Sequence, residues 1–280
     1  MKKFALIMAV LTILTVLALP VAAISTAKNI GELPQTTEKI TIDGKKDTIY
    51  DQGMKFDCTL PNDASKTTDS TVKAYLLYDG KKTFYAFVEV VDKTPVAWTE
   101  DQYKKSPWSI DSIEIFFDFN NDGKDRDQYR IDCGGKPTYY DSSTKYDGLD
   151  KYGFDAWGFQ KTSTGYCVEF KITDYRNQVK VGGQVGIDWQ INDMKDASTR
   201  IVYNYKSSLE SKGAVGKLDY ITLGSKVVTV PVATTTKAAA TSAAKAATTT
   251  TAAKTADASV IVAAVAVVAL AGVVVCKKKH

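Results

Sequence analysis

Histidine is almost absent from this sequence, since the only one is His280 at its very end. Ser-His-Asp and Cys-His catalytic sites both need an imidazole as the base, so the rest of the chain cannot build either of them. A glycosidase needs only two carboxylates at a defined separation, but the acidic residues here show no recognisable catalytic spacing. We therefore predict a protein that is not an enzyme.

Cysteine is also scarce, with four in 280 residues. Cys276 stands in an apolar run near the end, which leaves an odd number in the rest of the chain and excludes complete internal pairing. Cys133 and Cys167 fall on opposite sides of their alternating segments, one with the apolar residues and the other with the polar ones. We expect no disulfide between them.

Long apolar stretches with helical spacing are missing between about residues 28 and 225. Short alternating segments take their place, separated by Gly, Asp, Asn and Pro, which is typical of an all-β sandwich. The clearest pair is 72–77 and 83–91, joined by the tight-turn residues Asp79 and Gly80. We predict one all-β domain over residues 28–225, an antiparallel β-sandwich of jelly-roll type.

The two ends of the chain have a non-globular composition. Residues 1–23 combine two early lysines with an apolar run and a small-residue end, the layout of a secretory signal peptide. Residues 258–276 are uncharged and apolar over roughly the length that a bilayer requires, and 277–280 follow as a basic cytoplasmic tail. Between the domain and this transmembrane helix, residues 226–257 are mostly Ala, Thr and Lys, which predicts a stalk.

The formal net charge of +4 belongs to those ends. Eight of the 36 basic residues are lysines within residues 1–23, 232–257 and 277–280; without them and Asp257, 28 basic residues face 31 acidic ones, a net charge near −3. A nucleic-acid partner is not expected on that balance. The membrane is the expected partner of residues 258–276, with the domain on the outer surface of a bacterial cell.

The most informative stretch is 108–123, which reads W-S-I-D-S-I-E-I-F-F-D-F-N-N-D-G. In its middle three apolar residues alternate with Ser112, Glu114 and Phe116, the period-two pattern of a strand with one buried face. Trp108 shares the parity of Glu114, and an indole beside a carboxylate suits the apolar face and the hydroxyls of a sugar. A Trp just before a strand is as often an anchor of the core or its rim, and both interpretations stay open.

The same stretch ends in an acidic turn. Asp118, Asn120 and Asp122 with Gly123 match the first half of a calcium loop, because alternate oxygens at a sharp Gly turn can converge on one hard cation. The second half does not match, since Tyr129 stands where a glutamate belongs, and this excludes an EF-hand. A looser calcium site and an ordinary acidic turn both fit.

Another alternating segment follows the turn and places Arg130 and Asp132 on one side. A planar donor fork beside a carboxylate suits the binding of hydroxyl groups. An exposed ion pair across two strands is the more common use of a single arginine at such a place.

Taken in order, these segments resemble the family 9 carbohydrate-binding modules, sandwich domains often attached to bacterial xylanases. The resemblance runs from about Ile40 to Leu223 and rests on blocks in the right order at plausible spacing. The blocks read I-D-G-x-x-D-x-x-Y, Y-A-F-V-E-V-V-D, S-P-W-S-I-D-S-I-E-I-F-F-D, Q-Y-R-I-D, G-Y-C-V-E-F-K-I and V-G-I-D-W-Q-I-N-D.

In that family a sugar at the end of a chain lies between two aromatic rings, with carboxylate, Arg and amide groups around it, and bound calcium has a structural role. The resemblance implies Trp108 as the first ring and a tyrosine of the late strand as the second, where the family has a Trp. It implies these binding residues: Trp108, Asp92, Glu114, Arg130, Asp132, Tyr203 and Tyr205. Calcium would be held by Asp118, Asn120 and Asp122.

The expected function is therefore the binding of plant-wall glycans of the xylan or cellulose type at the cell surface, near glycosidases that degrade them. A haem-binding redox domain of similar sandwich fold is one alternative, and it would have to ligate iron through Met54, Met194 or a lysine. A surface domain that only contacts other proteins is the other alternative.

Overall fold

The protein is described by a computed structural model, and its described residues form an all-β domain with one short α-helix, α2 (Glu100–Lys105), and one 3-10 turn, η1 (Thr48–Gln52). This confirms the predicted all-β class. The described residues are 27–96, 99–148, 153–196, 198–205 and 218–230. The strands are β1 (Asn29–Thr36), β2 (Met54–Asp57), β3 (Leu60–Pro61), β4 (Thr71–Tyr78), β5 (Thr83–Val91), β6 (Ser112–Asp118), β7 (Asp127–Asp132), β8 (Pro137–Asp141), β9 (Tyr146–Gly148), β10 (Ala156–Lys161), β11 (Gly165–Thr173), β12 (Gln184–Met194), β13 (Arg200–Asn204) and β14 (Tyr220–Val228).

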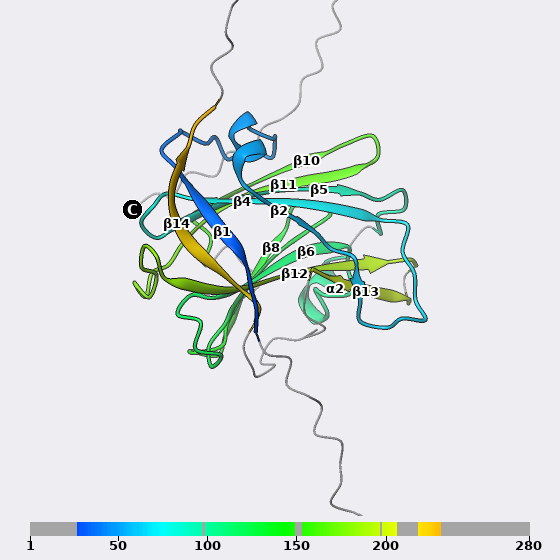
Figure 1. Cartoon of the computed structure of the whole chain (residues 1–280). Helices are drawn as coiled ribbons and strands as arrows, with labels where there is room; N and C mark the ends of the chain where they lie inside the picture. Colours follow the sequence, from blue (N-terminus) through cyan, green and yellow to red (C-terminus); the bar gives the residue numbers. More distant parts are fainter. Residues whose placement is uncertain (1–26, 97–98, 149–152, 197, 206–217, 231–280) are drawn as a thin grey trace, which may run out of the picture. The chain divides into compact units, whose positions relative to one another are not determined.

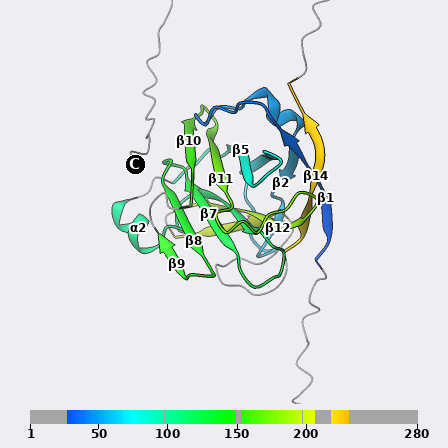
Figure 2. The same cartoon turned by 90° about the vertical axis from the view of Figure 1, so that its left-hand side faces the viewer.

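The strands form two layers, which lie one above the other in Figure 1. The first layer has the order β10-β11-β5-β4, with β2 also paired to β4. The second has the order β12-β6-β7-β8-β9, with β13 and then β3 on the other side of β12. Strands β1 and β14 pair in parallel and connect the two layers along one side, as Figure 2 shows from the second direction.

The hydrophobic core fills the space between the layers, because strand residues alternate between the two faces of a sheet. Ile113, Ile115 and Phe117 of β6 belong to this core, as their alternation predicts. Trp189 of β12 is 0% exposed and packs in the same core. The inner face of the second layer is therefore committed to packing, and its other face is left for a site.

Two segments differ from the sequence predictions. The aromatic, irregular and Gly-containing sequence of 139–152 predicts a long loop, but the region contributes strand residues to β8 and β9, because its backbone pairs with β7 and extends the second layer. The stalk was expected from residue 226, but β14 continues through Val228 in its pairing with β1. Local composition predicts neither outcome, since each depends on the pairing of the segment with another strand.

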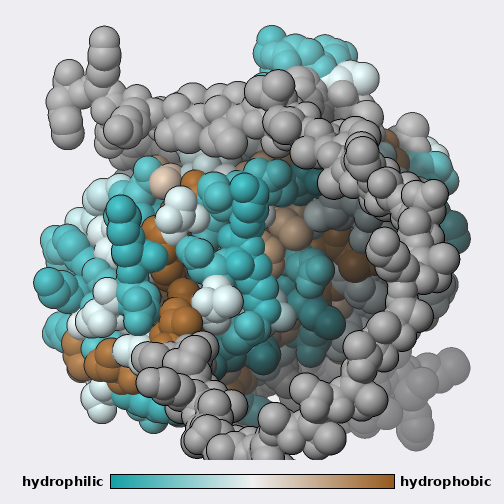
Figure 3. Space-filling view, turned by 90° about the horizontal axis from the view of Figure 1, so that it is seen from above, coloured by the Kyte–Doolittle hydropathy of each residue, from teal (hydrophilic) through white to brown (hydrophobic). Residues whose placement is uncertain are grey.

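The predicted signal peptide 1–23, transmembrane helix 258–276 and tail 277–280 lie outside the described residues. Within the part of the chain that the structure describes, no helix is long and apolar enough to cross a membrane. Where Figure 3 shows the described surface from above, it is mostly hydrophilic with a narrow hydrophobic band. Three cysteines of the described chain, Cys58, Cys133 and Cys167, are free thiols.

A buried carboxylate fastens the chain before β2 to the outer face of the first layer. Glu169 of β11 is fully buried, and its Oε2 accepts hydrogen bonds from the backbone N–H groups of Asp43 at 2.9 Å and Gly44 at 3.1 Å. Its Oε1 accepts a hydrogen bond from the Tyr50 hydroxyl at 3.0 Å. Burial raises the pKa of Glu169 to about 7, although these three donors act in the opposite direction.

Because the pKa of Glu169 is raised, we expect this carboxyl group to lower the free energy of unfolding as the pH rises. Its pKa is about 7 in the folded protein and returns to about 4 on unfolding. It therefore contributes stability that is fully present below about pH 4 and is lost as the pH rises through 7. We expect Glu169→Gln, which mimics the neutral carboxyl, to reduce the fall in unfolding free energy between pH 5 and pH 8 by about 2 kcal/mol.

Urea unfolding of the wild type and the variant at several pH values measures this difference. Glu89→Gln is the matched control, because Glu89 is an exposed glutamate on the neighbouring strand β5. Identical pH profiles for the wild type and Glu169→Gln would contradict the prediction.

Candidate functional site

The face of the second layer that points away from the core carries a polar row. Strand register places five residues side by side across β13, β12, β6, β7 and β8. None of the five is more than 7% exposed. Polar residues are mostly exposed in folded proteins unless they are paired, so this buried row indicates a specific use of the face. The row consists of Asn204, Gln190, Glu114, Arg130 and Thr138.

The Glu114 carboxylate lies at the centre of this row. Its Oε1 accepts hydrogen bonds at 2.6 Å from Arg130 Nε and from Asn192 Nδ2, and its Oε2 accepts one from Gln128 Nε2. Arg130 Nη1 donates in addition to the Thr138 hydroxyl at 3.2 Å. The ion pair is buried, not an exposed cross-strand pair, and a buried pair is held in place by such additional hydrogen bonds.

Trp108 lies in the turn before β6 and not in the strand itself. Strand parity therefore does not place it, yet its side chain lines a small cavity together with Arg130, Gln128 and Tyr140. Trp108 is 41% exposed, so it is available to a ligand. The structure thus brings the predicted Trp108 and Arg130 together and adds Gln128 and Tyr140, which the sequence analysis did not select.

Three buried amide oxygens on this face have no hydrogen-bond partner within the described part of the chain. They are Oε1 of Gln128, Oε1 of Gln190 and Oδ1 of Asn204. Buried polar atoms in proteins are nearly always paired. An amide oxygen accepts hydrogen bonds from hydroxyl groups, and of these three residues Gln128 is the one that lines the cavity beside Trp108.

Tyr203 and Tyr205, the expected second platform, face the other way. Tyr203 pairs with Ile191 of the core, and Asn204 takes the position beside Gln190 in the polar row. Tyr205 packs edge-on against Phe56, with ring centroids 4.9 Å apart. The register of β13 against β12 turns both tyrosines toward the core, so the structure does not bring them to Trp108.

Asp132, at the end of β7, supports the turn into β8. Its Oδ1 accepts hydrogen bonds from the N–H groups of Gly134 at 2.9 Å and Lys136 at 2.8 Å. Burial raises its pKa to about 6 against the effect of those donors. Asp132 therefore shapes the hairpin that carries Tyr140 and does not itself line the cavity beside Trp108.

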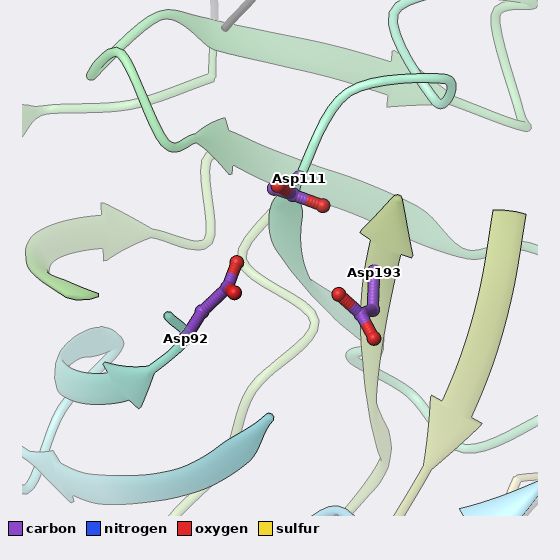
Figure 4. A group of neighbouring side chains, drawn as sticks. All are labelled: Asp92, Asp111 and Asp193. Carbon is purple, nitrogen blue, oxygen red and sulfur yellow. The ribbon is translucent and has the colours of Figure 1, made fainter. Parts of the chain in front are cut away.

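Asp92 belongs to a different group, which it forms with Asp111 and Asp193. Figure 4 shows the three side chains turned toward one another; Asp92 directly follows β5, Asp111 directly precedes β6 and Asp193 lies near the end of β12. One oxygen of each carboxylate lies within 4.8 Å of the other two, and all three residues are buried. Burial chiefly, and then the charges of Asp92 and Asp193, raise the pKa of Asp111 to about 7.

The surroundings of this carboxylate group suit a cation. Its three members take part in none of the ion pairs found among the described residues. They do accept hydrogen bonds from nearby donors: Asp92 from the Thr94 N–H at 2.8 Å, Asp111 from the N–H groups of Val96 and Met194, and Asp193 from the hydroxyls of Thr68 and Ser70. The Tyr166 hydroxyl is buried without a hydrogen-bond partner in the described chain, and burial together with the charges of Cys133, Asp111 and Asp92 raises its pKa. Hard carboxylate oxygens gathered in this way are the donors that Ca²⁺ prefers.

The acidic turn after β6 is engaged with its own backbone. Asp118 accepts hydrogen bonds from the N–H groups of Gly123 at 2.8 Å and Asp122 at 3.2 Å. Asn120 accepts another from Asp122 N–H at 3.2 Å, and Asp122 accepts one from Lys124 N–H at 2.8 Å. This is the usual role of Asp and Asn in turns, and it favours the ordinary-turn interpretation.

Fold and face together define a β-sandwich binding module with an aromatic side chain beside a buried polar row. The sequence profile of the family described as carbohydrate family 9 binding domain-like matches residues 42–211. The match covers more than half of the sequence, so the chain belongs to this family, and the resemblance noted above is confirmed.

Comparisons with individual proteins agree. Exoglucanase XynX of Acetivibrio thermocellus is 29% identical over 161 residues, which are 57% of this chain but only 14% of that protein. Two structures of a family 9 carbohydrate-binding module from Caldicellulosiruptor kristjanssonii, in complex with cellotriose and with glucose, are each 22% identical to this chain and share its fold. Their TM-scores are 0.57 and 0.55, and they cover 72% and 74% of this chain and 98% and 100% of their own.

Proposed function

We propose that the domain binds plant-wall glycans of the xylan or cellulose type through the face that carries the polar row. The observation that supports this best is an exposed Trp108 in one cavity with Arg130 and Gln128. The indole covers the apolar C–H face of a sugar ring. The guanidinium donates hydrogen bonds to its oxygens, and the free amide oxygen of Gln128 accepts one from a hydroxyl.

Two further residues complete this proposed site. Tyr140 lines the same cavity and offers a second aromatic surface in place of the tyrosines of β13. Glu114 positions the site, because its carboxylate holds Arg130, Gln128 and Asn192 at once. These side chains are already held in place before a sugar binds. Binding therefore costs less side-chain conformational entropy than it would if the side chains had to become ordered.

The proposal contains no catalytic step, in keeping with a family described as a binding domain. The same proposal includes attachment to a bacterial cell membrane through residues 258–276. It also includes separate glycosidases that act on the same glycans near the domain. Fractionation of cells that produce the full-length protein tests the attachment. Recovery in the soluble fraction would overturn it without touching the binding proposal.

Titration calorimetry of the full-length protein with cellotriose, xylotriose and mannotriose tests the binding itself. Heat of binding with either of the first two ligands supports the proposal and identifies the sugar. Absence of binding to all three, in protein whose cooperative thermal transition shows that it is folded, would overturn it and favour the alternative of protein contacts.

Calcium forms a second part of the proposal, held by Asp92, Asp111 and Asp193. A hard cation there would neutralise three buried carboxylates and join β5, β6 and β12. A ligand that binds only the folded state raises its stability. We expect EDTA to lower the melting temperature of the full-length protein by about 5 °C relative to millimolar CaCl₂.

Two aspartate variants distinguish the two candidate calcium positions. Asp111→Asn is expected to abolish the calcium-dependent shift in melting temperature, whereas Asp122→Asn in the acidic turn is expected to keep it. The opposite pattern would return the calcium to the turn of Asp118, Asn120 and Asp122. Equal melting temperatures in calcium and EDTA would remove calcium from the proposal.

A further inference from the structure

The polar face of the second layer extends beyond the Trp108 cavity to a second, larger one. This second cavity has a volume of about 220 Å³ and is lined by Asn62, Asp63, Lys66, Arg200 and Val202, among others. Val202 pairs with Asn192, whose side chain reaches Glu114, so the cavity opens at the edge of the same face. The two cavities therefore lie at opposite ends of one polar row, whose own residues are buried.

A continuous chain of hydrogen bonds connects the two cavities. Arg200 donates to Asn192 Oδ1 through Nε at 3.0 Å and through Nη2 at 2.5 Å. Asn192 donates in turn to Glu114, which is paired with Arg130 beside Trp108. Glu114 and Asn192 thus position both Arg130 in the first cavity and Arg200 in the wall of the second.

The side chain of Asn62, in the wall of the second cavity, lacks hydrogen-bond partners. Its backbone N–H donates to Val202 O at 3.0 Å, which anchors the residue beside β13. Both polar atoms of its side-chain amide are buried and have no hydrogen-bond partner in the described chain. Such an amide needs one group that accepts and one that donates.

The chemistry of the lining favours a neutral, polyhydroxylated group. Lys66 and Arg200 supply donors, Asp63 supplies acceptors and Asn62 supplies both. A sugar unit carries hydroxyls that donate and accept at once, which suits this mixture. The lining has two positive groups and one negative group, so it does not resemble a site built only for an anion.

We propose that this cavity binds a further sugar unit of the same glycan, so that the ligand lies across the strands from Trp108 to Asn62. This inference rests on the proposed function. Three strand spacings separate β7 from β13, a distance of about 14 Å. One sugar ring cannot contact both ends of that surface, so the inference predicts that affinity depends on chain length.

The test is a comparison of ligand lengths by titration calorimetry of the full-length protein. The wild type is expected to bind a tetrasaccharide of the preferred glycan about tenfold more tightly than the disaccharide, the gain that one or two good hydrogen bonds provide. Asn62→Leu fills the cavity with an apolar side chain of similar size and is expected to reduce this ratio to about one. Affinity for the disaccharide is expected to stay unchanged.

Two additional variants keep the outcome interpretable. Lys66→Ala, at a partly exposed side chain, is expected to reduce the same ratio about threefold. Asn29→Leu, on β1, is the matched control and should leave the ratio as it is in the wild type. Equal affinities of the wild type for both lengths, or a ratio that Asn62→Leu leaves intact, would overturn the inference. Loss of all binding in the wild type would instead overturn the proposed function.

Discussion

Replacing Trp108 by alanine is expected to weaken cellotriose or xylotriose binding by about a hundredfold, the effect of removing a central aromatic contact. The indole is the large apolar surface of the proposed site, and it is 41% exposed in a turn rather than packed in the core. Its removal should therefore leave the fold intact. Calorimetric titration gives the affinity, and thermal unfolding shows that the variant is folded.

Two controls separate stacking from a general loss of aromatic surface. Trp108→Phe retains a smaller ring and should lose about tenfold rather than a hundredfold. Tyr175→Ala removes an aromatic residue that is 59% exposed after β11, in the other layer, and should bind as the wild type does. Wild-type affinity in Trp108→Ala would show that the sugar binds elsewhere.

Replacing Arg130 by methionine is expected to lower the free energy of unfolding by about 3 kcal/mol and to abolish measurable binding. The change leaves the Glu114 carboxylate buried with only Asn192 and Gln128 as donors. An uncompensated buried charge is the main cost of breaking a buried pair. Urea unfolding measures the stability, and titration with the same oligosaccharides measures the binding.

The double variant Glu114→Gln with Arg130→Met tests that explanation. It removes both charges, so its unfolding free energy should return part of the way toward the wild-type value. Binding should stay lost, because the guanidinium donor is still missing. A double variant less stable than Arg130→Met alone would show that Glu114 stabilises the fold independently of its partner.

For β6, the strand of Glu114, the local sequence pattern was enough to predict which residues face the core. Alternation alone predicted which side of β6 faces the core, and the structure confirms it. It also placed Arg130 on the same side of its strand as Gln128, although only Arg130 was selected. Gln128 was missed because a glutamine in an alternating segment is usually just the exposed side of a strand, and nothing local shows that it is buried beside Glu114.

For the second aromatic residue of the proposed site, the local sequence pattern was not enough. Tyr203 and Tyr205 were chosen by motif, but the pairing of β13 with β12 turns them toward the core. Tyr140 was overlooked because its segment reads as an irregular loop, and only its pairing with β7 places it beside Trp108. In each case the face on which a side chain lies depends on a register that one strand cannot determine by itself.

The sequence by itself determined the all-β class, the family and the position of Trp108 in the chain, because alternation and turn residues act over a few neighbouring positions. Only the tertiary structure decided the polar row, the cavity at Asn62 and the gathering of Asp92, Asp111 and Asp193. These features join residues that are distant in sequence. They arise where backbone hydrogen bonds set strand beside strand, and that pairing is a property of the whole folded sheet.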